Sequence, residues 1–247
     1  MPSVRAILLD IEGTTTPLSF VHDVLFPYAR LRVEPFIREH WATPALPGIV
    51  AGLAKEHAAD SAADDRPPAW LASTDEETIR SAVAYCRWLI DRDGKPGARK
   101  SPALKHLQGL IWDRGYDQGE LHGVVFSDVP PAFRRWRDDG RTIAIYSSGS
   151  ELAQRRLFAT TEFGDLTPFI ARFFDTAVGA KAEPASYARI ASAMTLATGS
   201  VCFISDVTRE LAAAREAGFE VRLSVRPGNP PQEGAAAFEE VVSFDDL

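Results

Sequence analysis

Residues 4–15 read Val-Arg-Ala-Ile-Leu-Leu-Asp-Ile-Glu-Gly-Thr-Thr, and this stretch decides the fold. The apolar run from Val4 to Leu9 ends abruptly at Asp10, and Glu12 and Gly13 follow. A short apolar run that ends in polar and glycine residues is typical of a buried strand leading into a functional loop. The stretch therefore predicts a buried strand whose following loop carries the chemistry.

Three later runs have the same form: Thr142 to Tyr146 before Ser147-Ser148-Gly149, Val201 to Ser205 before Asp206, and Val221 to Val225 before Arg226. Helical patterns lie between these runs, at residues 131–139, 151–159, 183–194 and 209–217. Alternation of strands and helices favours a parallel sheet with helices on both faces. We therefore expect an α/β protein with a Rossmann-like core.

The segment between the first two strand runs differs from the rest. Residues 17–125 are mostly helical in pattern, because apolar residues recur at helical spacing over residues 20–41, 78–90 and 102–112. Pro27 and Pro35 are expected to break the first of these helices. The Ala-, Asp- and Pro-rich residues 43–75 are expected to be a flexible or surface connection. We expect a catalytic core of residues 1–16 and 126–247, with residues 17–125 as an inserted α-helical cap domain.

The charge, the apolar runs and the cysteines of the sequence argue against several kinds of partner, location and site. The chain has 247 residues, with 34 Asp and Glu against 27 Lys and Arg, and its net charge of −7 argues against a nucleic acid or an anionic membrane as partner. No apolar run approaches the roughly 20 residues of a membrane helix, and the first is too short for a signal peptide, so we expect a cytoplasmic protein. Cys86 and Cys202 are far apart and are expected to be buried reduced thiols.

The residues after the strand runs form one chemical set. In an open parallel sheet, ligands bind beyond the carboxyl ends of the strands. Carboxylates, hydroxyls and an ammonium collect there, and together they fit a phosphate ester bound through Mg²⁺: Asp10, Glu12, Ser147, Ser148, Asp206 and Lys181. Asp10 is the natural nucleophile, and Glu12 is placed to protonate the leaving oxygen and later to deprotonate water.

Each residue alone has a simpler interpretation. Asp10 fits a turn or a helix cap, Lys181 fits a solvated surface lysine, and Asp206 fits an N-terminal cap with Glu210 as an exposed first-turn carboxylate. Their joint occurrence after successive strands favours a site. Ser147 and Ser148 would bind phosphate oxygens, and Lys181 would balance the charge of Asp10 and the phosphate.

These motifs resemble the haloacid dehalogenase superfamily of aspartate-nucleophile phosphohydrolases. Glu12 stands where most members have Asp, and Asp206 with Glu210 replaces a common pair of aspartates. Both departures point to one branch, the enolase-phosphatases of methionine salvage, which the chain resembles over nearly its whole length. The runs that carry the resemblance are residues 9–17, 25–28, 145–150, 205–210 and 225–229.

The resemblance implies a Mg²⁺-dependent monomer with one Mg²⁺ per subunit. Its implied substrate is 2,3-diketo-5-methylthiopentyl-1-phosphate, which is enolised and then dephosphorylated to 1,2-dihydroxy-3-keto-5-methylthiopentene, an acireductone. The implied metal positions are Asp10, Glu12 and Asp206, with Glu12 acting through either its side chain or its backbone carbonyl, and the implied substrate-binding residues are Ser147, Ser148 and Lys181. The inserted helices would close over the substrate.

Three other functions compete with this interpretation. A serine hydrolase of the α/β type needs a His after its Ser, and no His follows Ser147 or Ser148. A nucleotide-binding module would need a phosphate-binding glycine motif after the first strand, which the sequence lacks. A phosphatase of the same superfamily that acts on another small phosphate ester shares all four motifs and stays open, and no residue is singled out as the enolisation base.

Overall fold

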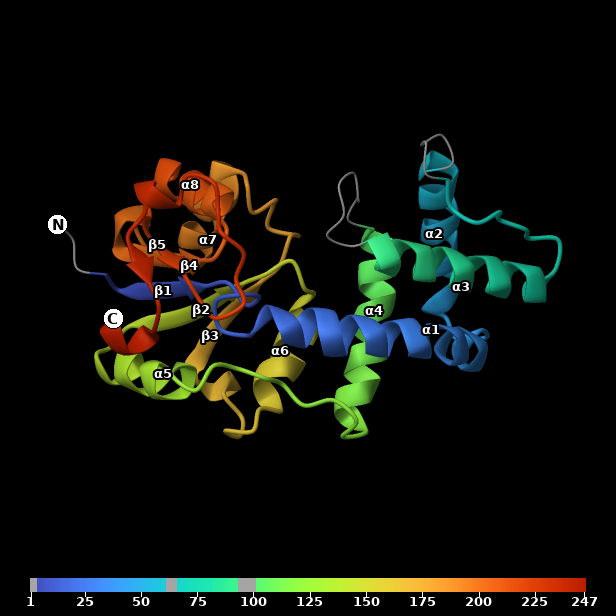
Figure 1. Cartoon of the computed structure of the whole chain (residues 1–247), viewed down its shortest axis with the longest axis horizontal. Helices are drawn as coiled ribbons and strands as arrows, with labels where there is room; N and C mark the ends of the chain where they lie inside the picture. The colour runs from blue at the N-terminus through green and yellow to red at the C-terminus, as the bar shows by residue number, and fades with distance from the viewer. Residues whose placement is uncertain (1–3, 61–65, 93–100) are drawn as a thin grey trace. The chain divides into compact units, whose positions relative to one another are not determined.

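The computed structural model describes residues 4–60, 66–92 and 101–247, and within them a six-stranded parallel sheet forms the centre of one unit (Figure 1). The strands lie in the order β3-β2-β1-β4-β5-β6. β1 pairs with β2 on one side and with β4 on the other, so the order reverses at β1. The strand bounds are β1 Ala6–Leu9, β2 Thr142–Tyr146, β3 Ile170–Phe174, β4 Val201–Ser205, β5 Glu220–Ser224 and β6 Glu240–Val241.

Helices cover both faces of this sheet, as predicted (Figure 1). Two helices, α5 (Val129–Asp138) and α6 (Glu151–Ala159), lie on one face, and α7 (Pro184–Ala193) and α8 (Thr208–Glu216) lie on the other. Every residue of β1 and β4 is buried, since both faces of these strands are covered. The predicted α/β architecture with a Rossmann-like sheet is confirmed.

Local sequence signals explain most of the element bounds. Ser150 caps α6 by accepting a hydrogen bond from the backbone N–H of Ala153 at 3.3 Å. Gly218 follows α8 with a φ of +93°, a conformation that glycine adopts without strain.

The strands β3 and β6 were not predicted. β3 is at the edge of the sheet and exposes Ala171 and Arg172, so its sequence lacks the continuous apolar run of a central strand.

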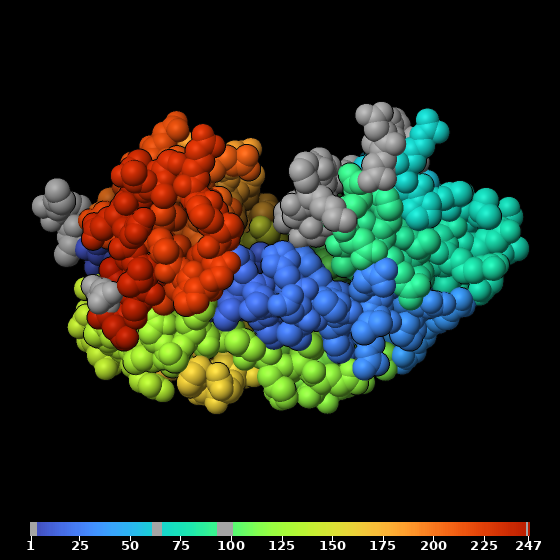
Figure 2. All heavy atoms as spheres, in the orientation of Figure 1, coloured from blue at the N-terminus to red at the C-terminus, as the bar shows by residue number. Residues whose placement is uncertain are grey.

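The chain end packs over α5, where Figure 2 shows the C-terminal segment against the residues of that helix. Arg135 of α5 donates a hydrogen bond to the carbonyl oxygen of Leu247 at 3.2 Å. The ring of Trp136 lies 5.3 Å from the ring of Phe244, which is fully buried. Phe244 is therefore part of the core of this unit.

The other unit is helical and contains the inserted segment. It comprises α1 (Phe26–His40), α2 (Leu46–Asp60), α3 (Asp75–Arg92) and α4 (Pro102–Asp117), with a π-helical turn, η1 (Phe20–Leu25), ahead of α1. α1 packs on α3 and α4, and α2 packs on α3 and α4. Among the described residues, no helix of either unit is both long and apolar enough to cross a membrane.

Two expectations for this helical unit are wrong. Pro35 lies inside α1 instead of breaking it: Pro35 and Leu31 are both exposed, so water can satisfy the Leu31 carbonyl that the proline leaves without an N–H partner. Residues 46–60 form the helix α2 instead of a flexible connection. Alanine favours the helix, and a face that includes Leu46, Ile49 and Leu53 is buried; residues 61–65 of that expected connection lie outside the described residues.

Along the chain, the boundaries between the two compact units fall at different residues from those expected. One unit comprises the residues up to Val21 and Gly119–Leu247, and the other comprises His22–Gln118, whereas the sequence placed the boundaries at 16/17 and 125/126. Residues 119–125 belong with the sheet because Gly123 forms a β-bridge to Thr161 and Phe126 donates its N–H to the Thr15 carbonyl at 3.0 Å. That the helical unit acts as a cap stays a prediction.

Both cysteines are buried and unpaired, as predicted. Burial raises the pKa of the Cys86 thiol and that of the Cys202 thiol to about 12. Neither thiol is ionised at neutral pH, so neither is an activated nucleophile.

Candidate active site

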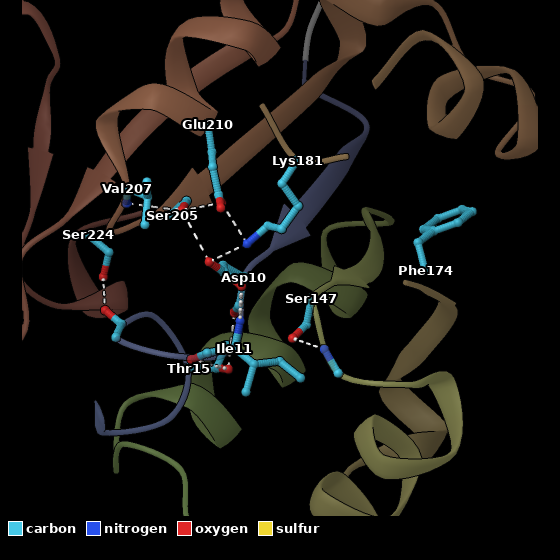
Figure 3. Close-up of polar contacts among 12 residues, drawn as sticks. Asp10, Ile11, Thr15, Ser147, Phe174, Lys181, Ser205, Val207, Glu210 and Ser224 are labelled. Atoms are coloured by element: carbon cyan, nitrogen blue, oxygen red, sulfur yellow. Dashed lines mark hydrogen bonds and ion pairs between the residues drawn. The ribbon is translucent and has the colours of Figure 1, made fainter. Parts of the chain in front are cut away.

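Asp10 directly follows β1, at the point where the strand order reverses. It is 4% exposed, and its N–H continues the sheet ladder by donating to the Ile204 carbonyl at 3.0 Å. Its Oδ1 accepts a hydrogen bond from the Ile11 N–H at 2.7 Å, and the Thr15 hydroxyl donates to its carbonyl oxygen at 3.2 Å (Figure 3). The Asp10 carboxylate is therefore held by its own loop at the switch point, where open sheets bind ligands.

Lys181 joins two carboxylates in one buried cluster (Figure 3). Its Nζ lies 2.6 Å from Asp10 Oδ2 and 2.6 Å from Glu210 Oε2, and its side chain is 7% exposed. The Ser205 Oγ lies 3.2 Å from each of these same two carboxylate oxygens. Burial alone would lower the pKa of Lys181, but the two ion pairs outweigh it and raise the pKa, so the ammonium stays charged.

Two tyrosines hold the segment that carries Lys181. The Tyr187 hydroxyl donates to the Lys181 carbonyl at 2.7 Å, and the Tyr146 hydroxyl donates to the Gly179 carbonyl at 2.9 Å. The Lys181 ammonium also lies 5.9 Å from the centroid of the Tyr146 ring, within reach of a cation–π interaction. These contacts place the ammonium without help from regular secondary structure, because Lys181 precedes α7.

Asp206 follows β4 and lies against the loop of Asp10. Burial raises the pKa of Asp206 to about 7, and the nearby charges of Asp10 and Glu210 add to that rise while Lys181 opposes it. A Cβ on Gly13 would lie 2.4 Å from Asp206 Oδ2, closer than atoms can approach, and Gly13 has a φ of +67°. Gly13 is therefore required both for its backbone conformation and for the close approach of Asp206.

Ser147 ends up beside Asp10 because β2 pairs with β1. Its hydroxyl is buried and accepts a hydrogen bond from the Gly149 N–H at 3.2 Å, and its own N–H donates to the Phe174 carbonyl at 3.2 Å. Gln154 fixes the same loop by donating from Nε2 to the carbonyl oxygens of Gly149 and Phe174, both at 2.9 Å. Ser148 follows, half-buried.

Glu12 is half-buried and forms a β-bridge with Thr16. The structure thus brings Asp10, Lys181 and Glu210 into direct contact and places the charge of Asp206 beside them. The catalytic, substrate-binding and metal-binding roles expected of the site residues all stay predictions: Asp10, Glu12, Ser147, Ser148, Lys181 and Asp206.

The carboxylates of Asp10 and Asp206 are the candidate ligands for a divalent cation. In the chain segments that the structure describes, no group of three or more His, Cys, Asp or Glu side chains is arranged to hold a metal ion. Asp10 and Asp206 are nevertheless close enough for their charges to raise the pKa of Asp206, and a cation between them would remove this repulsion. Mg²⁺ needs only one or two carboxylates because it keeps several waters. The donor set therefore fits Mg²⁺.

Sequence reasoning gave no site role to two members of the cluster, although Glu210 belongs to the last of the motifs named above. Glu210 is not an exposed first-turn carboxylate: its side chain is 15% exposed and pairs with Lys181. Ser205 was placed in its strand, but its hydroxyl between Asp10 and Glu210 was not foreseen. The available signal was the position of Glu210 in the first turn of the helix that follows Asp206, close in the chain to the end of β4.

The sequence and the structure of this chain are similar to those of several known proteins. A family model described as haloacid dehalogenase-like hydrolase matches residues 4–218. "Enolase-phosphatase E1" of Synechococcus elongatus is 48% identical over 245 residues, which cover 99% of this chain and 98% of that protein. A Vitis vinifera protein, "Probable bifunctional methylthioribulose-1-phosphate dehydratase/enolase-phosphatase E1 1", is 43% identical over 252 residues, which cover 100% of this chain and 47% of that protein. The crystal structure of the UTR4 protein of Saccharomyces cerevisiae has a TM-score of 0.74 and 30% identity, with 99% of this chain and 100% of that chain covered.

Proposed function

The chain belongs to the haloacid dehalogenase-like hydrolase family, and from this premise we propose that it is an enolase-phosphatase, an acireductone synthase of methionine salvage. It converts 2,3-diketo-5-methylthiopentyl-1-phosphate to 1,2-dihydroxy-3-keto-5-methylthiopentene and inorganic phosphate. The observation that carries the phosphatase step is the buried ion pair between Asp10 and Lys181, 2.6 Å apart, at the switch point of the sheet.

The relatives support the choice of substrate. The Vitis vinifera relative joins a methylthioribulose-1-phosphate dehydratase to an enolase-phosphatase in one chain. Loss of water from methylthioribulose 1-phosphate gives a diketone phosphate, which is the compound proposed here as substrate. Enolisation then moves a proton from C1 to the C2 carbonyl oxygen and makes C1 part of an enol phosphate.

Asp10 carries the phosphoryl transfer. A carboxylate oxygen of Asp10 forms a bond to phosphorus while the bond between phosphorus and the C1 oxygen breaks, which leaves an aspartyl-phosphate. Glu12 gives its proton to the leaving oxygen. It then takes a proton from the water that attacks the aspartyl-phosphate, so that phosphate is released, Asp10 is again a carboxylate and Glu12 is again protonated.

Lys181 supplies positive charge where negative charge gathers. Its ammonium faces the Asp10 carboxylate at 2.6 Å, in a site too buried for water to screen the interaction. Ser147 and Ser148, at the end of β2, bind oxygens of the substrate phosphate. Glu210 keeps Lys181 in position from the opposite side through its own 2.6 Å contact.

One Mg²⁺ per subunit would complete the site. Asp10 and Asp206 would hold it by their side chains, and Glu12 would contribute its backbone carbonyl. When bound, Mg²⁺ would offset the negative charge of the phosphate dianion beside Asp10. The helical unit, residues 22–118, is the cap that excludes water and binds the methylthio end of the substrate. The protein acts in the cytoplasm as a monomer, which size-exclusion chromatography with light scattering tests.

The function is tested with purified protein, Mg²⁺ and a panel of phosphate esters that includes the diketone phosphate. Enol absorbance and free phosphate are followed in the same sample. The proposal requires the enol signal and phosphate release with the diketone, and the loss of both in EDTA. Efficient hydrolysis of another small ester without turnover of the diketone would identify a different phosphatase of the same family.

A further inference from the structure

The loop after β5 is attached to the loop of Asp10 by three side chains. Ser224 Oγ donates to the Gly13 carbonyl at 3.0 Å, and Asn229 Nδ2 donates to the same carbonyl at 2.9 Å. Arg226 Nε donates to the Thr14 carbonyl at 3.2 Å. The segment 224–229 therefore fixes the backbone just beyond the nucleophile, although none of its residues belongs to the chemical set described above.

The orientation of the Asn229 amide is fixed by its neighbours. Nδ2 faces two carbonyl oxygens, those of Gly13 at 2.9 Å and Ser224 at 3.2 Å, and only the NH₂ group can donate to both. Oδ1 must then point the other way. It is buried, and no described residue donates a hydrogen bond to it.

Asn229 Oδ1 and Asp206 Oδ2 lie near one another, on the same side of Gly13. A Cβ on Gly13 would lie 3.0 Å from Asn229 Oδ1 and 2.4 Å from Asp206 Oδ2, so both oxygens pack against the position that a side chain on residue 13 would take. A buried carbonyl oxygen without a donor is unfavourable, and this cost is removed when a donor arrives. Waters that accompany Mg²⁺ are such donors.

We propose that Asn229 is a positioning residue for the Mg²⁺ site: its NH₂ group holds the Gly13 carbonyl, and its Oδ1 accepts a hydrogen bond from a water that the cation brings. This inference deepens the proposed function and rests on it. Partners of this kind orient metal ligands, and their loss typically weakens metal binding 10–100-fold.

The loop keeps its place without Asn229. Arg226 is 5% exposed, pairs with Asp128 at 2.7 Å and donates to the carbonyl oxygens of Thr14 and Val242. Ser224 retains its own bond to the Gly13 carbonyl. Substitution of Asn229 is therefore expected to leave a folded protein with an altered metal site.

The test uses Mg²⁺ alone, without substrate. Metal-free full-length protein is titrated with MgCl₂ in a calorimeter, and its Tm is measured in EDTA. The variants are Asn229→Ala, the nearly isosteric Asn229→Asp, and a control, Gln232→Ala, which removes an amide from the same loop whose Nε2 contacts only the Pro230 carbonyl at 3.4 Å among the described residues.

We expect Asn229→Ala to bind Mg²⁺ about tenfold more weakly than the unchanged protein. Asn229→Asp keeps an oxygen at the Oδ1 position, so its Mg²⁺ affinity is at least that of the unchanged protein, while its kcat falls because the Gly13 carbonyl has lost a donor. Gln232→Ala changes neither quantity.

Two results overturn the inference: a Mg²⁺ Kd for Asn229→Ala within twofold of the unchanged protein, or an Asn229→Asp variant that binds Mg²⁺ more weakly than the unchanged protein. The second result decides alone if the Ala variant does not fold. A failure of the proposed function is separate, because it is seen in the unchanged protein as absence of turnover of the diketone phosphate.

Discussion

Replacing Lys181 by Met tests the charge arrangement of the whole site. Met has nearly the length of Lys but no charge, so it leaves the carboxylates of Asp10 and Glu210 buried without the ammonium that lies 2.6 Å from each. Removing one partner of a buried ion pair typically destabilises a protein by about 3–5 kcal/mol. For a chain of this size, that corresponds to a fall in Tm of about 10 °C.

The effect depends on pH with a definite sign. The pKa of Glu210 is already raised, mainly by burial, although Lys181 lowers it; without Lys181 the pKa rises further. The variant is therefore most destabilised at high pH, where the stranded carboxylates are ionised, and recovers part of its stability as the pH falls and they bind protons. Phosphatase kcat falls at least about 100-fold at every pH, because the ammonium that faces the Asp10 carboxylate is gone.

Urea unfolding in EDTA at pH 5.5 and pH 8, with phosphate release measured in parallel, checks these values. Lys55→Met is the matched control, because Lys55 is exposed on α2. In the double variant Lys181→Met/Glu210→Gln, one stranded carboxylate is gone, so stability at pH 8 recovers in part while activity stays lost. A Lys181→Met protein as stable at pH 8 as the Lys55→Met control would refute the reasoning.

Three further predictions concern single groups. Asp10→Asn is expected to fold, which circular dichroism checks, and to release no phosphate. If enolisation uses another base, the enol phosphate accumulates and is seen by stopped-flow absorbance. Substrate binding without any enol signal would mean that both steps need Asp10. Asp206 has a pKa of about 7 in the metal-free protein, so a proton competes with Mg²⁺ for its carboxylate. The Mg²⁺ affinity measured by calorimetry should therefore fall about tenfold per pH unit below pH 7 and level off above it. An affinity that does not change from pH 5 to pH 8 would contradict this. Gly13→Ala introduces a Cβ 2.4 Å from Asp206 Oδ2 at a residue with a positive φ, so Mg²⁺ binding and turnover should both be lost. Gly119→Ala is the control for backbone strain alone, because Gly119 has a φ of +70° and open space around it.

Strand residues with continuous apolar runs were predictable, and those at the sheet edge were not. Thr142–Tyr146 and Val201–Ser205 have the predicted bounds, because a strand covered on both faces needs uninterrupted apolar side chains. β3 contains exposed Arg172, and β6 has two residues, so neither shows such a run. Pro35 misled for a related reason, since its tolerance in α1 depends on exposure to water, which follows from packing.

The sequence by itself determined which residues end the central strands, and therefore that Asp10, Ser147 and Asp206 meet at one edge of a parallel sheet. Strand direction and periodicity are local properties, so local sequence fixes them. Only the tertiary structure decided that Lys181 turns inward to Asp10, that Glu210 is its second partner, and that Asn229 reaches Gly13 across 216 positions. These contacts join segments far apart in the chain, and burial and charge pairing select them only after the sheet has brought those segments together.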